Sequence, residues 1–421
     1  MNNLLSMRYL IFTASLLYCI NLNLYSQTTI SLKEAIQLTL KNNPYYQAEK
    51  LNNDLARAEI INAGMKQNPS ASFSFIQIPV PKYFAENTSV LNPQNRESTI
   101  ELSKSFQVKG QRKLKIEKAE KEYGITQSSL RDYERNMVLG TAEKWLDVWY
   151  SKNKMNILKA AKINSDSLLK INQIRLKNQV ITNTEFLRTQ IVDDQYSLLL
   201  KSSEQEQISE IQNLKLIAGI DSPVFVSEMD SVFIILVPQS ADSLVNYALQ
   251  NRTDIVATKK AVDAARTDIR LQLANSYPQP EIGINYSTQE HTPYIGSYLA
   301  VPIPVFNRNQ GEIAKSKIVL NQTENLLYAT NQKVKTEIEN TWNEYTTNRI
   351  VYEKYREIYR KSENVLNVVK MAYLKGGTTI LDYLEAERNW FELQNQFYEA
   401  FYNYQKSYLE LLFASNLIQN I

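Results

Sequence analysis

Cysteine and histidine are almost absent from this sequence of 421 residues, which has one of each, Cys19 and His291. With one histidine, the chain has no candidate Ser/His/Asp or Cys/His catalytic set and no H-E-x-x-H zinc motif, and it has no glycine-rich loop that would cradle a phosphate. Its carboxylates are numerous, but without a cleft that binds a substrate they do not indicate a catalytic site. We therefore predict no catalytic activity, no cofactor and no metal site, and we interpret His291 as a loop residue.

Glycine and proline are also scarce, with 10 and 12 residues. No proline lies between residues 94 and 222 and none follows Pro304, whereas prolines crowd residues 69–93 and 278–304. Because proline lacks a backbone N–H and clashes with the preceding helical turn, helices cannot run through the crowded stretches. The sequence thus predicts a mainly α-helical protein with a small β part.

Strong charge of either sign is missing as well. The formal net charge is +3, and no basic run or basic and aromatic stripe stands out. Nucleic acid is therefore not expected as a partner.

The N-terminus has the pattern of an export signal. Arg8 precedes an apolar run from Tyr9 to Ile20, which is shorter than the roughly 20 residues that a membrane-spanning helix needs. We predict a signal peptide at residues 1–26, with cleavage after Ser26. Cleavage would remove Cys19 and leave a thiol-free chain, which excludes disulfides. A lipid anchor on Cys19 is the alternative, although the bulky residue before it argues against one.

The remaining chain contains an internal repeat. The segment that begins SLKEAIQLTLKNN at Ser31 matches the one that begins SADSLVNYALQNR at Ser240, at an offset of 209 residues. Further along the offset falls to about 197–199, which aligns Trp145 with Trp342. We predict one structural repeat over residues 27–239 and a second over 240–421.

Each repeat carries one proline-rich stretch in which apolar and polar residues alternate. This period of two predicts β-strands. We expect one hairpin at about 71–106, pairing 71–80 with 97–106, and another at about 281–305, pairing 281–288 with 297–305. The first strand alternates poorly, because Phe73 and Phe75 fall on the face opposite Ile76.

The proline-free stretches predict very long helices. At about 1.5 Å per residue, the segment from Glu312 to Lys375 would extend on the order of 95 Å. Its apolar residues recur every seven positions, which indicates a left-handed supercoil with a partner helix. They are Ile338, Tyr345, Tyr352, Tyr359, Leu366 and Tyr373. The next segment, with Trp390, Phe397 and Phe401 among its apolar residues, supplies an antiparallel partner, and the glycine pair Gly376-Gly377 between them predicts the tip of a helical hairpin.

Four strands create a physical problem, because a four-stranded sheet cannot close on itself and its edges are hardly stable alone. In a membrane every backbone group must be paired, so the sheet would have to close across subunits. Two copies give eight strands with a filled lumen, whereas three copies give twelve strands and an open passage.

Three segments carry a family resemblance: the doubled pattern LKEAIQLTLKNNPYY, the segment VPIPVFNRNQGEIAKSK and the segment YLKGGTTILDYLEAE. Over essentially the whole mature chain the sequence resembles the outer-membrane efflux proteins, the TolC-like channels, and within them the CusC/CzcC-like branch that serves resistance-nodulation-division (RND) pumps. The resemblance implies a homotrimer in the outer-membrane lipid with a twelve-stranded β-barrel, continued through the periplasm by a barrel of coiled-coil helices.

The resemblance also implies partners at the hairpin tips. A periplasmic adaptor protein would dock there and connect the channel to an inner-membrane pump of the RND type. In this sequence the docking residues are those of the two tips: Leu176, Lys177 and Asn178 in the first, and Leu374, Lys375, Gly376, Gly377 and Thr378 in the second.

At the entrance, the resemblance implies that Asp382 and Glu385 ring a constriction. Three copies would gather six carboxylates, which repel anions, attract cations and raise their own pKa values. An alternative interpretation of Asp382 is helix capping with Thr379 as the N-cap, and both can hold together. The repeat places Glu185 opposite Asp382 and Arg188 opposite Glu385. We hypothesise that Arg188 pairs with Asp382 or Glu385 and holds the entrance shut.

Two residues near this implied entrance limit what the resemblance predicts for it. Thr378 stands where some relatives have an arginine, so a closing contact built on that arginine is not expected here. Tyr373 is a further entrance candidate, but it ends the heptad pattern, which favours a position in the helix core.

Two alternatives remain open. A channel of this family can serve type I protein secretion instead of efflux, and the sequence does not separate the two. A periplasmic coiled-coil scaffold without a barrel is the other, although alternating hairpins at the same place in both repeats argue against it.

Overall fold

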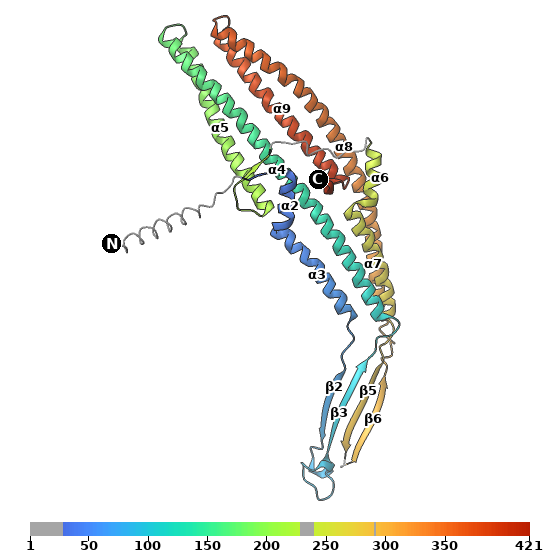
Figure 1. The fold of residues 1–421 in the computed structure, drawn as a ribbon. Helices are drawn as coiled ribbons and strands as arrows, with labels where there is room; N and C mark the ends of the chain where they lie inside the picture. Colours follow the sequence, from blue (N-terminus) through green and yellow to red (C-terminus); the bar gives the residue numbers. More distant parts are fainter. Residues whose placement is uncertain (1–27, 228–239, 290–291) are drawn as a thin grey trace, which may run out of the picture. The chain divides into compact units, whose positions relative to one another are not determined.

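The computed structural model describes residues 28–227, 240–289 and 292–421 (Figure 1). The predicted signal peptide, Cys19 and His291 lie outside these residues. Among the described residues no helix is both long enough and apolar enough to cross a membrane.

The order of the main elements occurs twice along the chain, as helix, helix, strand, strand, long helix and helix. In the first half these are α2 (Leu32–Asn42), α3 (Pro44–Gly64), β2 (Ser70–Gln77), β3 (Arg96–Ser105), α4 (Gln111–Lys177) and α5 (Asn183–Ala218). In the second half they are α6 (Ala241–Asn251), α7 (Thr253–Asn275), β5 (Glu281–Gln289), β6 (Thr292–Ala300), α8 (Gln310–Leu374) and α9 (Ile380–Ala414). Short strands β1 (Thr28–Ile30) and β4 (Val224–Val226) and three 3₁₀ turns, Pro81–Tyr83, Pro93–Asn95 and Ile418–Asn420, complete the described elements.

The described residues form two compact units, and each unit draws on both halves of the chain. One lies within Met1–Gln47, Tyr133–Ala248 and Thr336–Ile421, and the other within Ala48–Asp132 and Leu249–Lys335. The boundaries predicted for the two repeats remain predictions.

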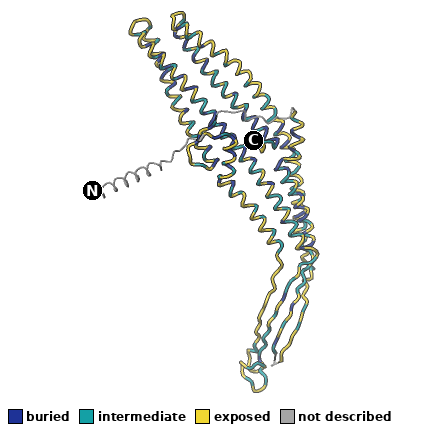
Figure 2. The backbone as a smooth tube through the Cα atoms, viewed as in Figure 1, coloured by how far each residue is buried: buried dark blue, intermediate teal, exposed yellow. Residues whose placement is uncertain are grey.

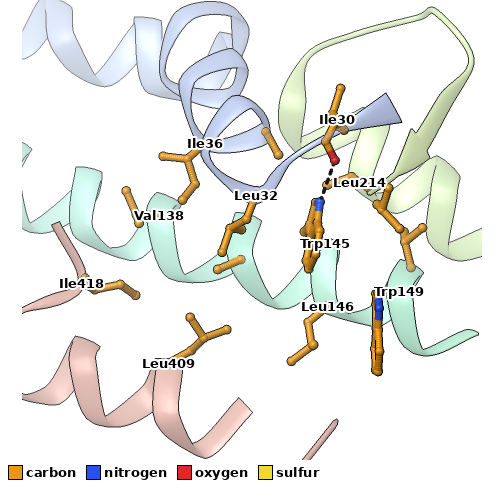
Figure 3. Close-up of a cluster of buried hydrophobic side chains, with 14 of the residues drawn as sticks. Ile30, Leu32, Ile36, Val138, Trp145, Leu146, Trp149, Leu214, Leu409 and Ile418 are labelled. Carbon is orange, nitrogen blue, oxygen red and sulfur yellow. Dashed lines mark hydrogen bonds between the residues drawn. The ribbon is translucent and has the colours of Figure 1, made fainter. Parts of the chain in front are cut away.

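The first unit is built around a buried core beside β1 and β4, which pair in parallel. Trp145 of α4 is almost fully buried there, and its indole Nε1 donates a hydrogen bond to the carbonyl oxygen of Ile30 at 3.1 Å (Figure 3). Leu214 of α5 and Leu409 of α9 pack into the same cluster. Burying a large aromatic residue with its N–H satisfied stabilises this junction of helices from both halves.

The predicted coiled-coil seam between α8 and α9 is confirmed. Tyr345, Tyr352 and Tyr359 of α8 contact aromatic residues of α9 in reverse order along the chain, which is the antiparallel arrangement. Tyr352 stacks on Tyr404 with ring centroids 5.6 Å apart, and Tyr359 stacks on Phe397 at 5.1 Å.

The second unit contains an antiparallel sheet in the order β2-β3-β5-β6. The first hairpin lies close to its predicted position, but β2 ends at Gln77, before Pro79 and Pro81, instead of at residue 80. The second hairpin was predicted with the wrong second strand: β6 is Thr292–Ala300 and not 297–305. The segment 301–305 lies outside it because Pro302 and Pro304 have no N–H to donate to a neighbouring strand.

The register of the sheet separates two chemically different faces. Ile100 lies opposite Phe73 on β2 and opposite Tyr286 on β5, so these side chains share one face. We call this the apolar face; its members are Ala71, Phe73, Phe75, Ile100, Leu102, Ile282, Ile284, Tyr286, Ile295 and Leu299, with Lys104 and a few small or polar residues between them. The opposite face carries mostly serine, threonine, asparagine and glutamate. Ile76, which made the alternation look poor, lies on that polar face.

Candidate functional site

The two hairpin tips have the same backbone geometry. In the first, Gln179 has a φ of 57°, and Val180 N–H donates to the carbonyl of Arg175 at 2.8 Å. In the second, Gly376 has a φ of 77°, and Gly377 N–H donates to the carbonyl of Ala372 at 2.8 Å. Both are left-handed helix ends that satisfy the last carbonyl groups of the helix. Of the glycine pair, only Gly376 has the positive φ that glycine adopts without strain, and Gln179 adopts it in the first tip.

The helices that leave the tips also start alike. Thr182 and Thr379 are N-caps, and Glu185 and Asp382 complete capping boxes with them. In the second tip, Asp382 Oδ2 accepts from the hydroxyl of Thr378 at 2.6 Å, the hydroxyl of Thr379 at 2.7 Å and the N–H of Thr379 at 3.1 Å. The capping interpretation of Asp382 is thus confirmed, and the matched caps fix the offset between the tips at 379 − 182 = 197 residues.

These caps keep the two acids ionised. The hydrogen bonds from Thr378 and then Thr379 lower the pKa of Asp382 below its ordinary value. The backbone N–H of Thr182, followed by its hydroxyl, lowers the pKa of Glu185 in the same way. Each tip therefore carries a negative charge whose position is set by its own helix start.

Glu385 and Arg188 lie on the two helices that follow the tips. Asp382 and Glu385 are exposed on α9. Glu385 also lines a groove of about 710 Å³ between α9 and α5, together with Arg388 and Gln195. Within the described part of one chain, no ion pair joins Arg188 to Asp382 or Glu385. The predicted pairing of Arg188 is not made within the single chain and stays a prediction.

Tyr373 is buried, with 4% of its surface exposed, as its place in the heptad pattern favours. Its ring stacks on Tyr383 with centroids 5.5 Å apart and an interplanar angle of 12°. Its hydroxyl donates to Asn172 Oδ1 of α4 at 2.6 Å, and Asn172 Nδ2 donates to the hydroxyl of Thr189 of α5 at 2.9 Å. Tyr373 thus connects its own hairpin, α8 and α9, to both helices of the other.

Arg175 strengthens the same connection. Its guanidinium carbon lies 4.6 Å from the centroid of the Tyr373 ring, and it donates to the carbonyl oxygens of Tyr373 at 3.3 Å and Leu374 at 3.4 Å. Arg175 therefore stabilises both the position of the Tyr373 ring and the C-terminal end of α8.

Sequence reasoning missed Asn172, Arg175 and Thr189, and it also missed a buried acid, Glu387. Only 1% of Glu387 is exposed, and neither carboxylate oxygen has a hydrogen-bond partner among the described residues. Burial raises its pKa to about 7, and Lys370 of α8 partly opposes the shift. Its spacing of four from Tyr383 and three from Trp390 places a carboxylate in the apolar seam, a signal that was present in the sequence.

Comparison with known proteins gives a consistent result. Residues 244–417 match the family model described as "Outer membrane efflux protein". A relative in Cupriavidus metallidurans, the cobalt-zinc-cadmium resistance protein CzcC, is 20% identical over 352 residues, which cover 79% of this chain and 80% of the relative.

Solved structures share the fold. A structure of CusC has a TM-score of 0.77 at 19% identity and covers 91% of each chain. The Campylobacter jejuni outer membrane channel CmeC has a TM-score of 0.77 at 15% identity, over 91% of this chain and 85% of that one. A membrane protein from Pseudomonas aeruginosa has a TM-score of 0.79 at 17% identity, over 91% and 92%.

Proposed function

We propose that the chain is an outer membrane efflux protein and that three copies form the outer-membrane exit channel of a tripartite efflux system, which the family match over residues 244–417 and the shared fold support. In this proposal a periplasmic adaptor and an RND-type inner-membrane pump deliver the substrate, and the channel passes it across the outer membrane. The channel itself performs no chemistry.

The observation that carries the proposal is the exposed apolar face of the sheet. Phe73 is 67% exposed and Ile295 is 86% exposed, and the strands β2 and β6 are mostly exposed along their length (Figure 2). An apolar surface of this extent on four adjacent strands is unfavourable in water and suits contact with lipid. The polar opposite face then suits a water-filled lumen.

The edges of the sheet support an assembly of several chains. Among the described strands, β2 pairs only with β3 and β6 pairs only with β5, so each chain has two open edges. Lipid provides no hydrogen-bond partners for these edges, so β6 of one copy must pair with β2 of the next. Three copies give a closed ring of twelve strands, which is wide enough to leave a passage.

The hairpin tips supply the periplasmic entrance. Asp382 is held by its cap and Glu385 is one turn further along α9, so threefold symmetry would bring six carboxylates together at the opening. Leu176, Lys177, Asn178, Leu374, Lys375, Gly376, Gly377 and Thr378 lie at the outer ends of the two hairpins and would contact the adaptor. Tyr373, being buried, positions the tips and does not contact the substrate.

Arg188 would complete this entrance by pairing with Asp382 or Glu385 of a neighbouring copy. Arg188→Ala is then expected to raise the single-channel conductance of the resting trimer and the leakage of large antibiotics into cells. Unchanged conductance and leakage would remove Arg188 from the entrance.

The name of the relative from Cupriavidus metallidurans favours efflux over protein secretion and places metal ions among the substrates to be tested. In the described residues, no group of three or more His, Cys, Asp or Glu is arranged to hold a metal ion. In our proposal the pump selects the substrate, and a metal ion would pass through the channel as cargo.

The test is the mass of the particle extracted from the outer-membrane fraction. The proposal expects a detergent-dependent trimer that resists extraction with sodium carbonate. A monomer that is released by carbonate without detergent would overturn it and favour the periplasmic scaffold.

A further inference from the structure

A recess of about 200 Å³ lies where β3 ends and α4 begins. Three basic residues line it, Lys66 before β2, Lys104 near the end of β3 and Arg112 in the first turn of α4. Ser105 and Gln107 add polar groups. Lys66 is distant from the other two in the sequence, so the basic character of the recess becomes evident only in the fold.

The three cations of the recess have no acidic partner. Among the described residues, no carboxylate lies within 4 Å of the charged nitrogens of Lys66, Lys104 or Arg112. Arg112 is oriented by its Nε, which donates to the carbonyl oxygen of Gly64 at 2.7 Å. The recess therefore concentrates positive charge that no described carboxylate pairs with.

The position of the recess along the membrane normal follows from Lys104, and this step rests on the proposed function. Lys104 lies on the apolar face, opposite Ile282 and two residues after Leu102. A lysine on a lipid-facing surface is strongly unfavourable at mid-membrane but is tolerated near the interface. Lys104 therefore marks the level of the lipid headgroups, and the helices that continue from this end make it the periplasmic side.

The second half of the chain lacks these charges at the corresponding positions. Aligning the starts of α4 and α8 gives an offset of 310 − 111 = 199 residues. At this offset Lys104 corresponds to Ile303, and Arg112 corresponds to Gly311. The connection from β6 to α8, which is longer than that from β3 to α4, thus has no basic residue at either place.

We propose that the recess binds the phosphate of an anionic phospholipid headgroup in the periplasmic leaflet of the outer membrane. The guanidinium of Arg112 can bind two phosphate oxygens side by side, and the two ammonium groups add point charges. Ser105 and Gln107 suit the hydroxyl groups of a glycerol headgroup. One lipid per chain would anchor each sheet at the interface.

The test compares lipid binding by two charge-matched variants of the assembled channel. One is Lys66→Gln/Lys104→Gln/Arg112→Gln. The control is Arg308→Gln/Lys315→Gln/Lys317→Gln, which removes three exposed charges near the start of α8. Delipidated trimers are titrated with phosphatidylglycerol, with phosphatidylcholine and with inorganic phosphate, and the bound lipid is counted by native mass spectrometry.

We expect up to three phosphatidylglycerol molecules per wild-type trimer, preferred over phosphatidylcholine. Each basic residue near an anionic lipid is worth about 1 kcal/mol, so the recess variant should bind on the order of a hundredfold more weakly. The control variant should match the wild type.

Equal binding by the recess variant and the wild type, in a trimer that still requires detergent, would overturn the lipid site alone. Competition by inorganic phosphate as effective as that by the lipid would make the recess a site for free phosphate and overturn the lipid assignment. A wild-type chain that needs no detergent would overturn the proposed function and the lipid site with it.

Discussion

The hydroxyl of Tyr373 donates a hydrogen bond to Asn172 Oδ1 at 2.6 Å, and both side chains are buried. The bond links the end of α8 to α4, 201 residues away in the sequence. Because Asn172 of α4 also donates a hydrogen bond to Thr189 of α5, the helices α4, α5 and α8 are joined at one side-chain amide. Helix α9 is joined to them by the stacking of Tyr383 on Tyr373.

Tyr373→Phe keeps the stacked ring and removes the donor. It leaves Asn172 Oδ1 buried without a partner, which costs about 1–3 kcal/mol. We expect a lower unfolding temperature of the solubilised protein and a higher resting conductance, because the two hairpins are less firmly joined. Tyr328→Phe, at an exposed site on the same helix α8, is the matched control and should change neither quantity. An unchanged Tyr373→Phe protein would show that stacking and Arg175 suffice.

Glu387 makes stability depend on pH. Its folded pKa of about 7 lies above its ordinary value of 4.5, so between these values the folded chain binds a proton that the unfolded chain has released. The contribution of Glu387 to the free energy of unfolding is therefore greatest below pH 4.5. It is lost as the pH rises through 7, by about 3 kcal/mol in total. The charged or titratable groups that act with it are Lys370 of α8, Tyr196 of α5 and Tyr383 of α9.

Glu387→Gln should remove this dependence. We expect its unfolding temperature to exceed that of the wild type at pH 8 and to approach it at pH 5. Glu399→Gln, at an exposed site on the same helix, should follow the wild type at both values. Parallel curves for Glu387→Gln and wild type would mean that Glu387 stays ionised in the folded chain.

Gly376 and Gly377 give a matched pair of alanine substitutions. A Cβ at Gly376 would meet nothing within 4 Å, but its φ of 77° costs an L-residue about 1–2 kcal/mol. At Gly377 φ is not positive, and a Cβ would make ordinary contact with the carbonyl oxygen of Ala372 at 3.5 Å. Gly376→Ala should therefore lower the unfolding temperature and Gly377→Ala should leave it nearly unchanged. The reverse order would contradict the turn geometry.

Asp382→Asn combined with Glu385→Gln tests the entrance charge. Asn can still accept the capping hydrogen bonds from Thr379, so the tip should remain folded while six charges are removed per trimer. We expect the ratio of cation to anion permeability to fall in planar bilayers. Glu399→Gln serves again as the exposed control on α9. A permeability ratio equal to that of the wild type would place the selective constriction elsewhere.

The sequence could predict those parts of the structure that follow from local patterns, such as the regular spacing of apolar residues. The seven-residue spacing from Ile338 to Tyr373 predicted the seam of α8 and α9, and two glycines predicted its turn, because both depend on local geometry. The second strand of the second hairpin was misplaced because apolar residues at 301–305 were given more weight than the missing N–H groups of Pro302 and Pro304. Asn172 was missed for another reason: burial of a single polar side chain is decided by helices distant in the sequence. Glu387 was missed although its spacing from Tyr383 and Trp390 placed it in the apolar seam.

The open edges of β2 and β6 also bear on genetics. In the proposed ring every sheet contributes one edge to each neighbour, so the hydrogen bonding of all three chains depends on every edge being intact. One chain with a damaged edge strand would break the closure for its two normal partners. A defective allele in this part of the gene would therefore act dominantly, and a cell expressing equal amounts of both forms would keep only about one intact ring in eight if chains mix at random.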